Sequence, residues 1–170
     1  MNDLTIYDSV KEQMKTGDLL QWRSKGVIGD LICWKTGHQV SHSSLVMCIT
    51  EYEGEEKRRF TTEALGRGPV LNLLSNRLQH IDGTCWWYPL NDEWDKRRKA
   101  IGERALRYIG CGVKYDYKGL LWQIMGYVSS DAASLFCSEY CYISWGFQGP
   151  VPYPGELTQL GIHKEGVQLV

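Results

Sequence analysis

Two residues far apart in the chain have the neighbours expected of a nucleophile and its base. Cys137 lies in the segment FCSEYC (136–141), where the sequence predicts the start of a helix. Unpaired N–H groups and the helix dipole at such a start favour the thiolate. His42 lies in SHSSLV (41–46), at the predicted start of a strand. An imidazole held near the thiol would complete the ion pair that cysteine nucleophiles use.

A predicted hairpin positions the histidine. Residues 42–50 and 58–65 have the composition of two strands joined by a charged loop. With the turn in the middle of that loop, Glu63 lies opposite Ser44, one step along the same face from His42. Diagonal neighbours of this kind are about 7–8 Å apart at the backbone, within reach of both side chains. A shift of one residue would turn Glu63 to the other face.

Hydrophobic periodicity and turn residues predict the remaining elements. Helices are predicted over residues 8–15, 24–34, 94–109, 117–127 and 137–145, strands over 19–22 and 84–90, and a strand or turn over 70–74. Prolines 150, 152 and 154 predict an extended tail over 149–170. No repeat or linker divides the chain, so we expect a single domain over 1–170 with its core at about 16–147.

Composition limits the classes of partner and the compartment. The chain has 19 basic and 20 acidic residues and a net charge of −1, which gives no reason to expect nucleic acid as a partner. No apolar run approaches the roughly 18 residues of a membrane span. The chain opens with MNDL instead of a basic and then apolar leader, and most of its six cysteines lie in apolar stretches. We therefore expect a cytoplasmic protein without a transmembrane segment.

The cysteine and histidine spacings do not predict a metal site. There is no CxxC pair and no Cys/His finger spacing, so a structural zinc site is not expected. A metal-dependent hydrolase built on His38, His42 and Glu63 is an alternative that lacks a convincing third protein ligand. We expect no metal and no cofactor.

Five short segments, in order, carry a resemblance to a known family. They are GDLL (17–20), SHSSLV (41–46), TEA (62–64), KYDY (114–117) and FCSE (136–139). Together they resemble the circularly permuted branch of the NlpC-like papain-fold cysteine hydrolases, which includes YiiX-like proteins and the lecithin:retinol acyltransferase group. The resemblance implies an α+β, papain-like fold with a small antiparallel sheet packed against helices. The cysteine segment follows the histidine segment here, which is the permuted order.

The resemblance also implies roles for individual residues. Cys137 is the expected nucleophile, His42 the base, and Glu63 the group that orients the imidazole. Tyr115 and Ser138 are expected at the oxyanion site or substrate pocket, with the backbone N–H of Cys137 as the default oxyanion donor.

Each assignment has an alternative from the residues alone. Cys137 could be an ordinary core cysteine, as we expect of Cys141, and Glu63 could be a carboxylate on the strand surface. His38 competes with His42 as the base, but His42 is favoured because it begins a strand, where a rigid element can aim it.

The implied activity is cleavage or transfer of an acyl group through a thioester on Cys137. Amide bonds of cell-wall peptides or other peptides are the favoured substrates, and lipid esters or amides are an alternative. A binding module that keeps the cleft without turnover is a third possibility. Without an export signal, access to a cell wall would need lysis, a secretion machine or a phage particle. Hydrolysis versus transfer, and the oligomeric state, are left open.

Overall fold

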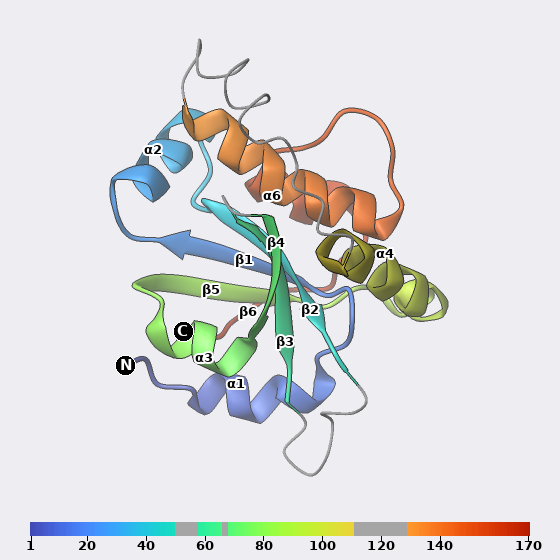
Figure 1. The fold of residues 1–170 in the computed structure, drawn as a ribbon. Helices are drawn as coiled ribbons and strands as arrows, with labels where there is room; N and C mark the ends of the chain where they lie inside the picture. The colour runs from blue at the N-terminus through green and yellow to red at the C-terminus, as the bar shows by residue number, and fades with distance from the viewer. Residues whose placement is uncertain (50–57, 66–67, 111–128) are drawn as a thin grey trace.

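An antiparallel sheet with helices on both faces forms the fold (Figure 1). A computed structural model describes residues 1–49, 58–65, 68–110 and 129–170. The strands are β1 (Leu19–Ser24), β2 (His42–Met47), β3 (Phe60–Leu65), β4 (Gly68–Leu73), β5 (Gly83–Tyr88) and β6 (Val167–Gln168), in the spatial order β4-β3-β2-β1-β5-β6. The helices are α1 (Thr5–Val10), α2 (Val27–Thr36), α3 (Leu74–His80), α4 (Arg98–Gly110) and α6 (Ser129–Trp145), with 3-10 helices η1 (Lys11–Gln13), η3 (Asp92–Arg97) and η4 (Pro154–Leu160). The predicted α+β class is confirmed.

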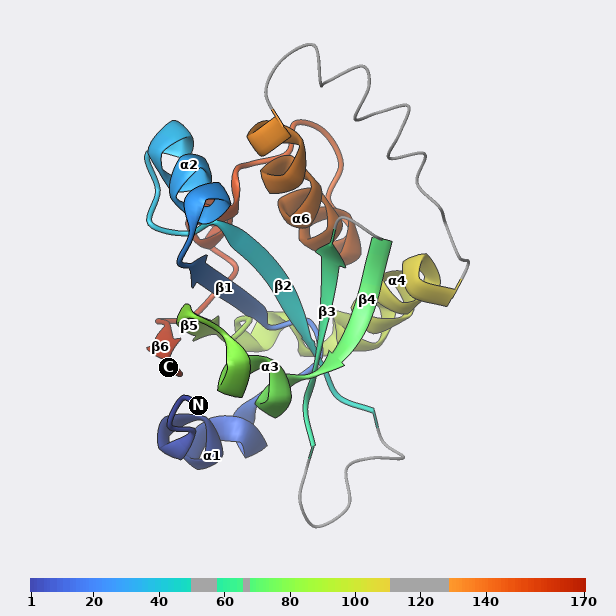
Figure 2. The same ribbon diagram turned by 60° about the vertical axis from the view of Figure 1, so that its left-hand side comes forward.

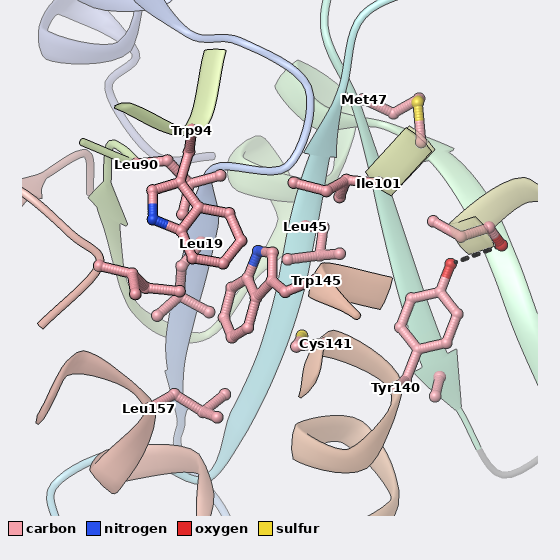
Figure 3. Close-up of a cluster of buried hydrophobic side chains, with 13 residues drawn as sticks. Leu19, Leu45, Met47, Leu90, Trp94, Ile101, Tyr140, Cys141, Trp145 and Leu157 are labelled. Atoms are coloured by element: carbon pink, nitrogen blue, oxygen red, sulfur yellow. Dashed lines mark hydrogen bonds between the residues drawn. The ribbon is translucent and has the colours of Figure 1, made fainter. Parts of the chain in front are cut away.

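Alternate side chains along the strands build a separate core on each face of the sheet. On one face, Leu19 and Leu45 pack with α4 and α6, and Figure 3 shows Trp145 of α6 directed towards them. On the other face, Trp22 and Val46 belong to a cluster with residues of α1 and α3. Figure 2 shows α6 on one side of the strands and α1 and α3 on the other. A residue's position in the strand alternation therefore decides which set of helices it meets.

The predicted hairpin register is correct. β2 and β3 pair antiparallel with Leu45 opposite Thr62, so the next step along the ladder brings Ser44 opposite Glu63. β1 pairs with the other edge of β2, and Trp22 lies directly opposite His42. The connecting loop, residues 50–57, lies outside the described residues.

The prediction that a helix begins at Cys137 is wrong. Helix α6 begins at Ser129, so Cys137 lies in its interior. The sequence gives a physical reason, because the segment SSD (129–131) supplies residue types that favour helix starts and is followed by two alanines, the strongest helix formers. The predicted helix over 117–127 and the KYDY segment lie outside the described residues.

The prediction of an extended tail over 149–170 is also wrong. Proline is compatible with the first position of a helix, and Pro154 begins η4. Beyond η4 the chain returns to the sheet, where β6 pairs with β5 through Trp87 and Val167. Helix α3 was not predicted, and it follows β4 directly. Within the described residues, no helix is both long enough and apolar enough to cross a membrane.

His163 is a half-buried residue between the tail and the core, and both of its ring nitrogens are buried. It forms an isolated bridge with Leu90, and its ring meets the Trp145 ring edge-on with centroids 5.1 Å apart. Neither ring nitrogen has a hydrogen-bond partner in the described part of the chain. Burial lowers the pKa of His163 to about 4, so its ring is neutral in the folded protein at neutral pH.

We predict that His163 makes the fold sensitive to mild acid. The unfolded chain binds a proton near the ordinary pKa of 6.5, whereas the folded chain does so only near 4, so stability falls as pH drops between these values. From pH 7 to pH 5, wild type should lose about 1–2 kcal/mol more unfolding free energy than His163→Leu. Guanidinium unfolding at both pH values measures this, with the exposed His80→Gln as control. Equal losses in wild type and His163→Leu would contradict the prediction.

Candidate functional site

The structure brings His42 and Glu63 into direct contact. His42 Nε2 lies 3.1 Å from Glu63 Oε2. The side chain of His42 is 15% exposed and that of Glu63 is fully buried. The contact that the hairpin register predicts is therefore present, and it comes from two neighbouring strands whose positions the sheet fixes.

The buried carboxylate of Glu63 has two further partners. Asn72 Nδ2 on β4 donates to Oε1 over 3.1 Å, and Arg77 Nε on α3 donates to the same oxygen over 3.1 Å. Burial acts to raise the pKa of Glu63, but the hydrogen bond and charge of His42, the charge of Arg77 and the hydrogen bond of Asn72 lower it to about 2. Glu63 is thus a carboxylate, and so a hydrogen-bond acceptor, throughout the physiological pH range.

Cys137 is the second group that acts on the imidazole. Burial acts to lower the pKa of His42, but the charge of Cys137 and its side-chain hydrogen bond with His42 raise it, and Glu63 adds to this, giving a value of about 9. A protonated imidazole beside a thiol favours the thiolate. The imidazole of His42 therefore interacts with both the thiol of Cys137 and the carboxylate of Glu63.

The position of Cys137 within α6 changes the physical basis of its expected reactivity. The helix dipole acts within about the first turn, and only the first four N–H groups of a helix lack intrahelical acceptors. Cys137 lies beyond both limits and is fully buried. The expected stabilisation by a helix start is therefore absent, as is the free backbone N–H expected to act as the oxyanion donor. His42 is the group that remains to activate the thiol.

The other predicted residues lie in different settings. Ser138 is fully buried next to Cys137 on α6, and its role in a substrate pocket stays a prediction. Cys141 lies in the core cluster of α6, as predicted, and burial raises its pKa well above the ordinary value. His38 is directed to the C-terminal part of the chain, with Nε2 3.9 Å from Glu156 Oε1. Tyr115 lies outside the described residues.

Three residues at the site were missed by the sequence analysis. Asn72 and Arg77 hold Glu63, and the guanidinium carbon of Arg77 lies 4.9 Å from the centre of the Trp22 ring. The pairing of β4 with β3 sets Val70 opposite Glu63, and Asn72 lies two residues further along β4 on the same face of the sheet. A strand or turn over 70–74 was predicted, and the strand alternative would have given Asn72 the same face as Val70.

The fold has a counterpart among solved structures. It is similar to that of metalloprotein yiiX from Escherichia coli, with a TM-score of 0.55 and 20% sequence identity over 78% of this chain. The match covers 65% of yiiX, so this chain spans just under two thirds of the length of that protein. No protein-family model and no curated protein sequence matches the chain. The expected YiiX-like relationship is therefore confirmed at the level of the fold.

The description of yiiX as a metalloprotein raises the question of a metal site here. Among the residues that the structure describes, no group of three or more His, Cys, Asp or Glu residues is arranged to hold a metal ion. His42 and Glu63 share a hydrogen bond, and His38 lies against Glu156 on another element. The described residues do not fit a metal centre, and we derive no step through one.

We predict that removal of metal leaves the protein unchanged, because the groups a metal would need are already engaged with one another. Dialysis against a strong chelator should shift neither the melting temperature nor the reactivity of Cys137 towards iodoacetamide. Elemental analysis before and after dialysis is the control. A fall in melting temperature that zinc reverses would instead support the set His38, His42 and Glu63.

We predict that Cys137 raises the pKa of His42 more than Glu63 does. Cys137→Ala removes both the sulfur charge and its hydrogen bond, so the pKa of His42 should fall further from about 9 than it does in Glu63→Gln. Titration of the imidazole carbon resonances by NMR measures this, and the exposed His80 serves as the internal control. A His42 pKa that is the same in Cys137→Ala and wild type would show that the thiol and the imidazole do not interact.

Proposed function

We propose that this chain is a cysteine hydrolase or acyltransferase of the permuted papain-like type, which cleaves amide or ester bonds through a thioester on Cys137. The observation that supports it is the position of His42, which shares one hydrogen bond with the buried Glu63 and another with the side chain of Cys137. A nucleophile, a base and an orienting group in this sequence of contacts are what covalent acyl transfer needs.

The residues would act in two half-reactions. In the ion pair, His42 already holds the proton of the Cys137 thiol, so the thiolate attacks the substrate carbonyl and His42 then gives that proton to the departing amine or alcohol. The carbonyl carbon is now bonded to sulfur as a thioester. In the second half, His42 removes a proton from water or another nucleophile, which attacks the thioester and releases the acyl group. The sulfur leaves as a thiolate while His42 keeps the proton, which restores the ion pair, and Glu63 keeps the imidazole oriented throughout.

The negative charge of the tetrahedral intermediate needs a donor other than the backbone N–H of Cys137. We propose the hydroxyl of Ser43. It is fully buried, it has no hydrogen-bond partner among the described residues, and it follows His42 in the chain. Strand alternation places Ser43 on the same face as Leu45, which packs with α6. A buried hydroxyl without a partner is costly to a fold, which is consistent with a partner supplied by substrate.

An amide substrate follows from the family resemblance, and one observation favours the lipid alternative. Helix α2 leads into the strand of His42, and it exposes Val27 by 85% and Trp34 by 78%. These residues are seven positions apart on the helix and so share a face. An exposed apolar face of this kind is the type of surface that meets acyl chains or membranes.

We predict that His42→Ala and Cys137→Ala each reduce turnover by at least about 1,000-fold, because each removes a group that takes part in the chemistry. Glu63→Gln should cost less, about 100-fold, because it acts only through the imidazole. The double variant of His42 and Cys137 should be no worse than either single variant. Release of product from a panel of stem peptides, other amides, and short-chain and long-chain lipid esters measures this and separates the two substrate classes.

Melting curves of each variant provide the control for folding. Activity retained in His42→Ala and lost in His38→Ala would move the base to His38. Wild-type activity in all three single variants, on a substrate that wild type cleaves, would contradict the cysteine mechanism.

A further inference from the structure

Arg77 contacts both oxygens of the buried carboxylate. Its Nε lies 3.1 Å from Oε1 and 3.4 Å from Oε2 of Glu63, so one donor contacts both oxygens of the carboxylate. Asn72 donates to Oε1, and His42 meets Oε2. Each oxygen thus has two partners, which restricts the orientation of the carboxylate group.

Arg77 is itself held by an aromatic platform. Its guanidinium stacks over the ring of Trp22, which is fully buried. The Trp22 indole N–H donates to Ser44 Oγ over 2.8 Å, and Thr61 Oγ1 donates to the same oxygen over 2.8 Å. An arginine stacked on a fixed ring keeps its orientation better than a free ion pair does. These hydrogen bonds hold the Trp22 ring in place on the sheet, and the ring in turn holds the guanidinium of Arg77.

The charge of Arg77 also affects the imidazole. Glu63 raises the pKa of His42, and a cation on the same carboxylate reduces the negative charge that His42 meets. In the described part of the chain, the charged or titratable neighbours are Cys137 of α6 and Glu63 of β3 around His42, and Arg77 of α3 around Glu63. On β5, the buried Cys85 senses both Arg77 and Glu63, and burial raises its pKa well above the ordinary value.

We propose that Arg77 is a positioning residue that aims Glu63 at His42 and limits the charge Glu63 presents to it, so setting the pH range in which His42 acts as a base. The catalytic part of this role rests on the proposed function. The effect of Arg77 on the titration of His42 does not. A merely structural arginine would alter stability without moving the titration of His42.

The test compares wild type, Arg77→Met, Arg77→Lys, Glu63→Gln and the double variant Glu63→Gln with Arg77→Met. NMR titration of the imidazole gives the pKa of His42 in each. Arg77→Met should raise this pKa, because a cation is lost and Glu63 keeps its full charge. In the Glu63→Gln background, the same change should have little further effect. Arg77→Lys keeps a charge without the planar fork, and it should return the pKa most of the way to the wild-type value.

Activity supplies the second readout. On any substrate that wild type cleaves, Arg77→Met should lower kcat on the order of 10-fold and move the pH profile of kcat upwards, with a smaller change in KM. Arg77→Lys should restore the wild-type pH profile more completely than it restores the magnitude of kcat. If Arg77→Met does not fold, Arg77→Lys carries the test, because a kcat equal to that of wild type would contradict the need for the planar fork.

The outcomes separate this proposal from the proposed function. An unchanged His42 pKa in folded Arg77→Met, or an equal shift in the Glu63→Gln background, would overturn the role of Arg77. Absence of turnover in wild type on the whole panel would count against the enzyme, and the titration would still decide whether Arg77 acts on His42 through Glu63.

Discussion

The burial of one carboxylate governs the arrangement of the site. A fully buried and ionised Glu63 would be strongly unfavourable without partners, because the interior solvates charge poorly. Three elements supply those partners: β2 provides His42, β4 provides Asn72, and α3 provides Arg77. Each partner restricts the carboxylate further, so the same contacts that make burial tolerable also fix its orientation. A rigid acceptor is what an imidazole needs in order to keep one tautomer and one orientation.

The thiol of Cys137 depends on His42 and Glu63 for electrostatic support more than the sequence suggested. A cysteine at a helix start has electrostatic support from the backbone even without an imidazole, but Cys137 is inside α6 and fully buried. Its support comes from His42, whose protonated state is favoured by the sulfur and by Glu63 together. Under the proposed function, the three residues would act as a coupled unit, and a change at Cys137 or at Glu63 is expected to alter the titration of His42.

The sequence predicted the parts of the site that local patterns determine. The register of the hairpin follows from two alternating strands and a central turn, and it was sufficient to bring Glu63 to His42. The contact between Arg77 and Glu63 joins a helix to a strand that is not its neighbour along the chain, and no periodicity signals such a pairing. The start of α6 was misplaced because the cysteine motif was given more weight than the helix-favouring residues before it. The tail was misjudged because proline excludes a central strand position but permits the first position of a helix.

The imidazole of His42 interacts with side chains from both faces of the sheet. Glu63, Arg77 and Trp22 connect His42 to the face of the sheet that α3 covers, whereas Cys137 comes from α6, which covers the opposite face. His42 is the first residue of its strand, a position from which one ring can reach groups on both sides. The imidazole therefore interacts with side chains that belong to two separately packed layers. A cavity opened in either layer would shift one partner relative to the ring, since packed interiors respond to lost volume with only partial relaxation. The arrangement of Cys137, His42 and Glu63 is thus sensitive to packing far from the imidazole, on both faces of the sheet.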